Sequence, residues 1–201
     1  MLLLVLTPQS TFNRLTYCRE FASGLYEKQC IELQADGTGE SRVKRRGSEE
    51  IRSAMMLSKT AQEKARALVA GTRNLADPQT YESKRKVANL GRKHITLEMS
   101  SETREAEFNY SDIKEVNALS TFFDALLNQE TLVFDLDTAA RYERLSIPER
   151  LDQLEGELRA GRIGDPEGLV PALDRLIQND RILDYAREHA QQMKTQILLK
   201  Q

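Results

Sequence analysis

Residues 91–127 read GRKHITLEMSSETREAEFNYSDIKEVNALSTFFDALL, and this stretch decides the fold class. Apolar and polar residues alternate in 93–99 and again in 104–110, which predicts the two strands of an antiparallel hairpin. From 116 to 127 the apolar residues recur at helical spacing instead. We therefore expect a strand, a turn, a second strand and a helix that covers the apolar face of the hairpin.

The apolar positions also predict how the hairpin is paired. A turn between residues 101 and 102 places Ile95 opposite Phe108, with both side chains on the buried face. The helical period places Phe123 on the apolar stripe of the next helix. We therefore expect Phe108 and Phe123 to belong to one core.

The preceding part of the chain predicts further strands and one helix. Ser58 has the position of a helix N-cap and Gly71 that of a helix stop, while residues 47–56 favour neither state clearly. Residues 1–130 are thus predicted to form an α+β domain, in which an antiparallel sheet of about five strands has helices on one face and water on the other. The additional strands are expected at 16–21, 26–33 and 40–46.

Residues 131–201 are predicted to form a separate α-helical C-terminal module. Ser146, Pro148 and Glu149 have the spacing of a capping box at the start of one helix. Two more helices follow with short connections, so we expect the three to pack antiparallel. The apolar stripe expected for the last helix contains Ile182, Leu183, Ala186, Ala190, Met193 and Ile197.

Two segments of this module resemble a known repeat. Residues 164–173, GDPEGLVPAL, and residues 182–190, ILDYAREHA, are similar to one helical hairpin of the HEAT-repeat type. The resemblance covers a single repeat, whereas a HEAT array needs several. The whole chain also resembles exported bacterial proteins of uncharacterised function, and this resemblance implies no catalytic residue.

Composition narrows the class of protein. The 201 residues carry a formal net charge of -2 and 30% charged residues, which argues against disorder and against a generally basic nucleic-acid binder. No apolar run is long enough to cross a bilayer. The first eight residues, MLLLVLTP, resemble the core of a secretory signal and are alternatively a first strand. We favour a periplasmic or extracellular location slightly, with the cytoplasm as the alternative.

The two cysteines, Cys18 and Cys30, lie at equal distances from Gly24. In a hairpin centred on Gly24 they would be cross-strand neighbours, so a disulfide is geometrically feasible in an oxidising compartment. The alternative is a reduced pair of small apolar side chains. Their spacing is not that of a zinc site.

Candidate catalytic groups are few. An enzyme would need Cys30, His94 or His189 gathered with a carboxylate in one cleft, as in a hydrolase with a Cys/His or His/carboxylate site. Glu98, Glu105 and Glu107 should share the wet face of the central hairpin, where solvated glutamates are common. No phosphate-binding fingerprint is present. We therefore expect no catalytic residue, no metal and no cofactor.

Basic residues cluster in two places along the sequence. A continuous strip of them would suit weak nucleic-acid binding, but nearby glutamates dilute both clusters and few aromatic residues accompany them. We expect a solvated charged edge rather than a nucleic-acid site. The residues are Arg42, Lys44, Arg45, Arg46, Lys84, Arg85, Lys86, Arg92 and Lys93.

These observations favour a non-enzymatic interaction or binding module, exported from the cell, whose partner is another protein or a peptide. The alternatives are a hydrolase-type enzyme and a weak nucleic-acid binder. The sequence does not indicate an oligomeric state.

Overall fold

The computed structural model of the chain describes residues 12–76, 81–89 and 91–199. The chain divides into two compact units, Met1–Thr121 and Phe122–Gln201, called here the sheet unit and the helical unit. The division lies within one long helix, α2 (Lys114–Tyr142). The boundary expected at residue 130 lies in the same helix. The signal-like start at residues 1–8 is outside the described residues.

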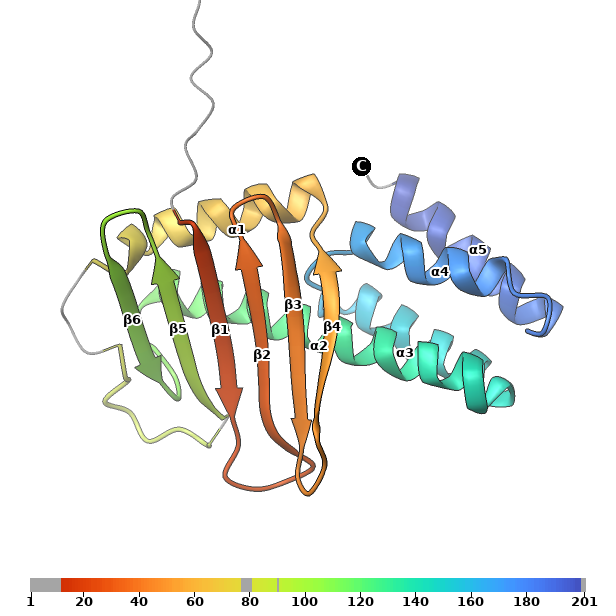
Figure 1. The fold of residues 1–201 in the computed structure, drawn as a ribbon, viewed down its shortest axis with the longest axis horizontal. Coiled ribbons are helices and arrows are strands. Elements are labelled where there is room, and N and C mark those ends of the chain that lie inside the picture. Colours follow the sequence, from red (N-terminus) through yellow and green to blue (C-terminus); the bar gives the residue numbers. More distant parts are fainter. Residues whose placement is uncertain (1–11, 77–80, 90, 200–201) are drawn as a thin grey trace, which may run out of the picture. The chain divides into compact units, whose positions relative to one another are not determined.

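The sheet unit contains a six-stranded antiparallel sheet in the order β4-β3-β2-β1-β5-β6 (Figure 1). The α+β class and the antiparallel sheet are confirmed, with six strands instead of about five. The additional strand, β4, comes from the segment that favoured neither state. The strands are β1 (Arg14–Glu20), β2 (Tyr26–Gln34), β3 (Thr38–Arg45), β4 (Glu50–Met56), β5 (Arg92–Glu98) and β6 (Thr103–Phe108).

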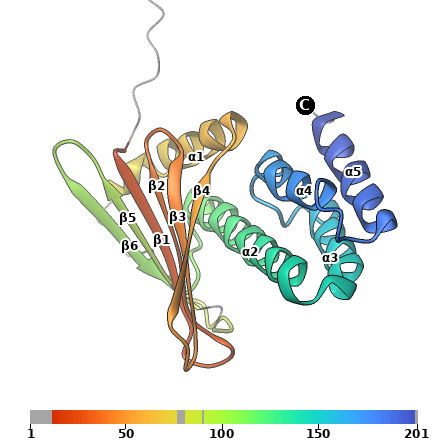
Figure 2. The same ribbon diagram turned by 45° about the vertical axis from the view of Figure 1, so that its right-hand side comes forward.

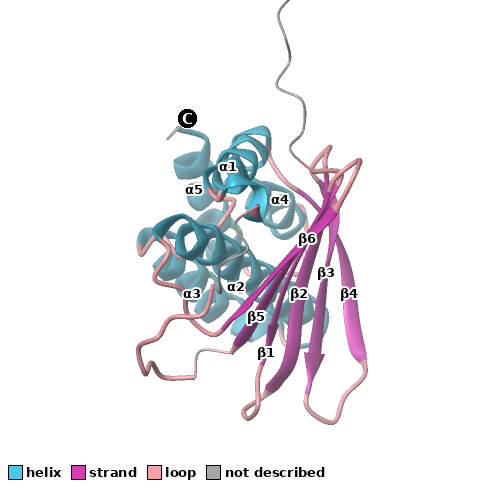
Figure 3. Ribbon diagram, turned by 90° about the vertical axis from the view of Figure 1, so that its left-hand side faces the viewer, coloured by secondary structure: helices cyan, strands magenta, loops and turns pink. Residues whose placement is uncertain are grey.

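One face of this sheet is buried and the other is polar. Figure 3 shows helix α1 (Lys59–Gly71) on the buried face, and no helix of the described part of the sheet unit lies on the opposite face. The alternation of side chains along each strand explains the difference, because odd and even positions point to opposite faces. The buried face includes Leu15, Tyr17, Ile31, Leu33, Ile95, Leu97, Ala106 and Phe108.

Helix α1 begins where the sequence predicts. The side chain of Ser58 accepts a hydrogen bond from the backbone N–H of Ala61 at 3.1 Å, which satisfies one of the free donors of the first turn. Ala61, Ala65 and Val69 recur at helical spacing and are buried. The predicted N-cap of this helix is confirmed.

The central hairpin is paired in a different register from the one expected. Ile95 lies opposite Ala106, and Phe108 lies opposite Lys93. The turn is centred earlier than expected, because the N–H of Met99 donates to the carbonyl oxygen of Glu102 at 2.9 Å. The shift amounts to two residues, so every side chain keeps its predicted face.

The two phenylalanines of the predicted common core are both fully buried, with 0% exposure each. Phe108 belongs to the sheet unit and Phe123 to the helical unit. Their shared core therefore stays a prediction. Within the sheet unit, the first part of α2 contributes Val116 and Leu119 to the buried residues.

A short segment after α1 has an unusual backbone. Arg73, Asn74 and Leu75 each have a φ of 54°, in the left-handed region that costs L-residues about 1–2 kcal/mol apiece. The guanidinium of Arg104 on β6 donates to the carbonyl oxygens of Arg73 at 3.3 Å and Asn74 at 3.0 Å. These two bonds hold the turn against the sheet.

The helical unit contains the rest of α2 and three further helices, with α4 and α5 side by side in Figure 2. Its core is formed by side chains such as Leu136, Leu151, Leu173 and Met193, all less than 2% exposed. No helix in the described ranges is long and apolar enough to cross a membrane. The helices are α3 (Ile147–Arg159), α4 (Val170–Ile177) and α5 (Asp184–Leu199), with 3-10 turns η2 (Arg144–Ser146) and η3 (Glu167–Leu169) before α3 and α4.

Two details of this unit correct the sequence-based expectations. The predicted capping box does not form, because η2 runs directly into α3 and leaves Ser146 in helical conformation. The Ser146 hydroxyl instead donates to the carbonyl oxygen of Glu143 at 2.8 Å. Leu183, expected on the buried stripe of the last helix, is 41% exposed in the turn before α5.

Candidate functional site

The polar side of the sheet is the first candidate surface, called here the outer face. Cys18 and Cys30 lie directly opposite each other on β1 and β2 and form a disulfide with an S–S distance of 2.10 Å. The predicted cross-strand proximity is confirmed. The outer face includes Arg14, Thr16, Cys18, Glu20, Lys28, Cys30, Glu32, Glu40, Arg42, Lys44, Glu50, Arg52, Arg92, His94, Thr96, Glu98, Glu105 and Glu107.

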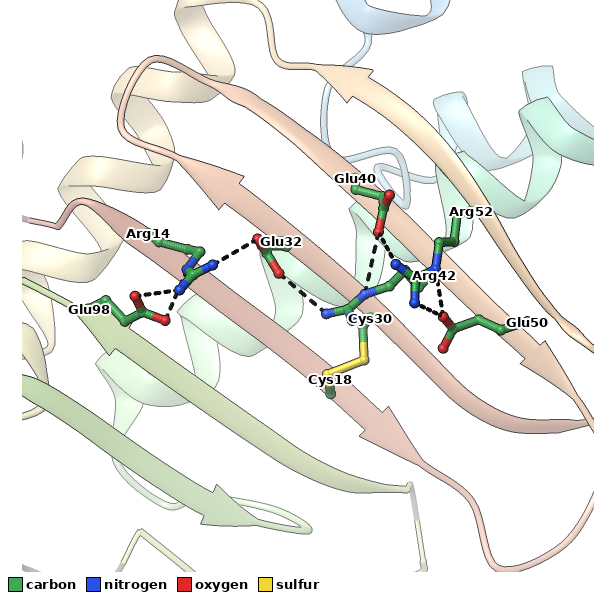
Figure 4. Close-up of polar contacts among 9 residues, drawn as sticks. All are labelled: Arg14, Cys18, Cys30, Glu32, Glu40, Arg42, Glu50, Arg52 and Glu98. Atoms are coloured by element: carbon green, nitrogen blue, oxygen red, sulfur yellow. Dashed lines mark hydrogen bonds and ion pairs between the residues drawn. A yellow bond between two sulfur atoms is a disulfide. The ribbon is translucent and has the colours of Figure 1, made fainter.

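A chain of ion pairs crosses the outer face beside the disulfide (Figure 4). Arg14 donates two hydrogen bonds to Glu98, at 2.9 and 2.7 Å, and these bonds raise the pKa of the guanidinium. Glu32 lies between Arg14 at 3.5 Å and Arg42 at 3.4 Å. The chain continues through Glu40, which lies 3.8 Å from Arg42 and 3.7 Å from Arg52, and ends at Glu50, 2.9 Å from Arg52.

A second group of charges lies around His94. Its Nε2 is 4.0 Å from a carboxylate oxygen of Glu20, and its Nδ1 is 3.7 Å from one of Glu107. A hydrogen bond from Lys28, at 2.6 Å, lowers the pKa of Glu20, and a hydrogen bond from Arg92 lowers the pKa of Glu107. Both carboxylates therefore already have cationic partners.

The basic residues of the first sequence cluster lie on β3 and just after it, and each interacts with a neighbour. Lys44 pairs with Glu27 at 3.1 Å, and Arg42 belongs to the ion-pair chain. The guanidinium of Arg45 lies 5.9 Å from the ring centre of Tyr26. The guanidinium of Arg46 donates to the backbone oxygen of Phe21 at 3.1 Å.

The second basic cluster is divided between surfaces. Arg85 pairs with Asp112, and Arg92 belongs to the group around His94. Lys93 is only 5% exposed and lies on the opposite side of β5 from Arg92. Lys84 and Lys86 are exposed. The structure therefore does not bring all the basic residues onto one face.

The candidate catalytic groups are held in structural contacts. The sulfur of Cys30 is bonded to Cys18. His189 of the helical unit lies 3.3 Å from a carboxylate oxygen of Glu155 and 3.7 Å from one of Asp152. Among the residues that the structure describes, no group of three or more His, Cys, Asp or Glu side chains could hold a metal ion.

A second candidate surface lies at one end of the helical unit, where α2 ends and where α4 turns into α5. A groove of about 640 Å³, called here the helix-end groove, is open to solvent there. Its lining consists of Tyr142, Glu143, Arg144, Leu145, Ser146, Arg181 and Leu183.

The apolar side chains of this groove are unusually exposed. Tyr142 is 80% exposed, Leu145 is 84% exposed and Leu183 is 41% exposed, and Tyr185 nearby in the sequence is 58% exposed. Scattered exposed apolar residues are normal in soluble proteins, whereas gathered ones mark interaction sites. The helix-end groove is thus a candidate apolar contact surface.

The groove also contains two arginines with free guanidinium groups. Within residues 12–76, 81–89 and 91–199, no hydrogen bond or ion pair involves the guanidinium of Arg144 or that of Arg181. By contrast, Arg187 nearby in the sequence pairs with Asp184 and, at 3.7 Å, with Asp180. The groove therefore combines apolar walls with two available cations and one carboxylate, that of Glu143.

Sequence reasoning missed this groove because its residues look ordinary in one dimension. Leu183 follows Ile182 and fits the spacing of the last apolar stripe. Tyr142 and Leu145 fall where α2 gives way to η2, so no helical period predicts which way they point. The available signal was a tyrosine and a leucine interleaved with charges at a helix end.

A buried polar cluster lies elsewhere in the helical unit. The side chain of Gln129 accepts a hydrogen bond from the N–H of Asp165 at 2.8 Å, and both residues are at most 2% exposed. Burial, together with the charges of Asp165 and Asp137, raises the pKa of Glu130 to about 7. Gly164 fits tightly here, because a Cβ on it would lie 2.6 Å from Leu126. The cluster fixes the loop before α4.

Comparison of the chain with protein-family models gives no match, and comparison with curated proteins gives none either. The resemblance of α4 and α5 to a HEAT hairpin therefore stays a prediction, and the two surfaces described above are the basis for assigning a function.

Proposed function

We propose that this protein is a non-enzymatic interaction module, that it binds a peptide segment of another protein, and that the helix-end groove is the binding surface. The observation that carries the proposal is the gathering of Tyr142, Leu145 and Leu183 at one place, all of them exposed. A solvated tyrosine and two leucines give a partner apolar area to bury, and burial of such area drives most protein association.

The state of the candidate catalytic groups supports the non-enzymatic part of the proposal. Cys30 has no free thiol while the disulfide is intact, and each histidine lies between two carboxylates. Screens with ester, peptide and phosphate substrates should give no turnover. Turnover that disappears in a folded His94→Ala or His189→Ala variant would contradict this part.

The disulfide also supports a location. Disulfides persist in oxidising compartments and are rare in the cytosol, so we place the working protein in the periplasm or outside the cell. Thiol labelling of protein taken directly from its native compartment should leave Cys18 and Cys30 unmodified unless a reductant is added first. Full labelling without reductant would contradict the proposed location.

Selection from a random octapeptide library displayed on phage tests the binding function. We expect enriched peptides that bind the wild-type protein and no longer bind a Tyr142→Ser/Leu145→Ser variant. Because both side chains are at least 80% exposed, this variant should fold normally. A Leu25→Ser/Met56→Ser variant is the matched control, since these residues are 61% and 60% exposed but belong to the sheet unit. Failure to enrich any peptide would contradict the proposed function.

A further inference from the structure

We infer that the partner segment bound by the helix-end groove carries an acidic residue next to an aliphatic or aromatic one. This inference rests on the proposed function and adds the chemistry of the ligand. It is carried by Arg144 and Arg181, which line the same groove as the exposed apolar side chains and have no partner among the residues that the structure describes.

Free guanidinium groups at an apolar groove favour a carboxylate. Arginine presents planar donors that match the two oxygens of a carboxylate, and such charge-assisted hydrogen bonds are stronger than neutral ones. Several arginines elsewhere on the protein already have such partners, as Arg175 does with Asp137 at 2.8 Å. At Arg144 and Arg181 the partner position is open to a ligand.

Glu143 limits the ligand to a modest negative charge. Its carboxylate lines the groove together with the two arginines, so the lining has a net charge of +1. A strongly charged polyanion such as nucleic acid would meet repulsion from Glu143, and nucleic-acid sites usually consist of many cations. A peptide with one acidic side chain matches this balance of charges better.

The size of the groove fits a short segment. A volume of about 640 Å³ accommodates a few side chains, within the usual range for ligand sites. The acidic side chain would lie between the guanidinium groups, and its apolar neighbour would contact Tyr142, Leu145 and Leu183. A second copy of the chain fits less well, because a two-fold interface places the same excess of arginine on both sides.

The peptides selected above provide the test. We would label a selected octapeptide with a fluorophore and measure its anisotropy while titrating it with protein. The same titration would be done with a peptide in which the acidic residue is replaced by its amide, Asp→Asn or Glu→Gln. We expect the amide peptide to bind at least 10-fold more weakly to the wild-type protein. An Arg144→Gln/Arg181→Gln variant should bind the acidic peptide at least 10-fold more weakly and should not distinguish the two peptides.

An Arg159→Gln variant is the matched control, because Arg159 is exposed on α3, pairs with Glu155 and does not line the groove. It should bind the acidic peptide as the wild type does. Circular dichroism of each variant would verify that it is folded.

The remaining outcomes distinguish failure of this inference from failure of the proposed peptide-binding function. The inference would be wrong if the selected peptides depend on Tyr142 and Leu145 but lack acidic residues. It would also be wrong if they bind the double arginine variant with an affinity within twofold of wild type. Either result would still support the binding function. A dimer in sedimentation that dissociates on Tyr142→Ser/Leu145→Ser substitution would identify a second copy as the occupant and also overturn the inference. The absence of any selected peptide would overturn both.

Discussion

The outer face of the sheet unit and the helix-end groove of the helical unit are both exposed, and both carry arginine side chains. On the outer face each guanidinium of the ion-pair chain has a carboxylate neighbour, as Arg42 has in Glu32 and Glu40. In the groove Arg144 and Arg181 have none among the described residues. Under the proposed function, the pairing of charges, more than their number, distinguishes a solvated face from a surface that binds a partner.

The disulfide of the outer face and the apolar side chains of the groove also differ in exposure. The outer face contains the Cys18–Cys30 disulfide, whose cysteines are only 8% and 3% exposed although they lie on the polar side of the sheet. Long charged side chains on the neighbouring strands can cover such a group with their aliphatic stems. In the groove Tyr142 and Leu145 have no such cover.

The largest expected effect comes from the core of the sheet unit. Phe108→Ala should destabilise the protein by about 3–5 kcal/mol, because the buried ring leaves a cavity. Denaturant unfolding followed by circular dichroism measures this change. Leu25→Ala, at a residue 61% exposed, is the control and should change stability by less than about 0.5 kcal/mol. Equal effects of the two substitutions would show that the assignment of buried and exposed faces is wrong.

Phe123→Ala should be equally destabilising, since its ring is also 0% exposed. Its comparison with Phe108→Ala tests the shared core predicted from the sequence. In the double variant, the two effects should add within about 0.5 kcal/mol if the rings are independent and should deviate by more if they touch. Simple additivity would therefore contradict the shared core.

The disulfide should have the next largest effect. Its cysteines are separated by 12 residues, and closing a loop of this size contributes about 3 kcal/mol in the chain-entropy account. A Cys18→Ala/Cys30→Ala variant should lose roughly this amount, and reductant should destabilise the wild type but not the variant. An unchanged denaturation midpoint in fully reduced wild-type protein would show that the bridge does not stabilise the sheet unit.

The fold was largely predictable from the sequence where only neighbouring residues determine the structure, as in helix capping and strand alternation. Ser58 caps α1 as its spacing predicts, and the alternation around Ile95 gave the correct buried face. The hairpin register was wrong by two residues because the side-chain period fixes the face but not the turn. Strand β4 escaped prediction because consecutive residues such as Met55 and Met56 differ in burial but not in polarity.

The candidate site was less predictable because it depends on tertiary contacts. Cys18 and Cys30 could be paired from their symmetry about Gly24, a local feature. Whether Arg42 or Arg144 has a partner depends on residues distant in sequence, such as Glu32 across the strands. The sequence does not reveal whether a charged side chain has an oppositely charged partner in the fold. The unpaired arginines of the groove could therefore not be distinguished from the paired arginines of the outer face.

The buried carboxyl of Glu130 predicts a pH dependence of the helical unit. Burial and the charges of Asp165 and Asp137 raise its pKa from 4.5 to about 7 in the folded protein, so the folded state binds the proton more tightly than the unfolded state. The stabilisation is complete below about pH 4.5 and is lost as the pH rises through 7. Glu130→Gln removes the ionisation and should stabilise the protein at pH 8 by about 1–3 kcal/mol.

Denaturation of wild type and Glu130→Gln at pH 4.5 and at pH 8 measures this difference. At pH 4.5 the two proteins should be nearly equal in stability, because Glu130 is protonated in the folded wild type. Glu188→Gln is the control, because Glu188 is exposed on α5 and has no ion pair among the residues that the structure describes. A stability difference that does not change with pH would contradict the raised pKa.

The smallest effect on stability is expected for substitutions on the outer face. These substitutions directly test the difference between the paired arginines there and the unpaired arginines of the groove. Glu40 lies between Arg42 and Arg52, and solvent-exposed ion pairs of this kind contribute about 0–1 kcal/mol. Glu40→Gln should therefore leave the denaturation midpoint almost unchanged. It nevertheless leaves Arg52 with Glu50 alone and Arg42 with Glu32 alone, so the outer face gains positive charge.

A Glu32→Gln/Glu40→Gln variant tests whether ion pairing prevents the arginines of the outer face from binding anions. If it does, the variant should bind heparin, a polyanion, more tightly than the wild type and elute from a heparin column at higher salt. Charge alone would also increase retention, so the control is Glu63→Gln/Glu188→Gln, which makes the same change in net charge at residues with no ion pair among those the structure describes. Removing carboxylates that neutralise neighbouring arginines should shift elution more than removing isolated ones, since adjacent unpaired guanidinium groups bind phosphate or sulfate together. Equal shifts in elution for the two variants would mean that net charge, and not ion pairing, determines what the outer face can bind. The outer face and the helix-end groove would then differ only in the exposed apolar side chains of the groove.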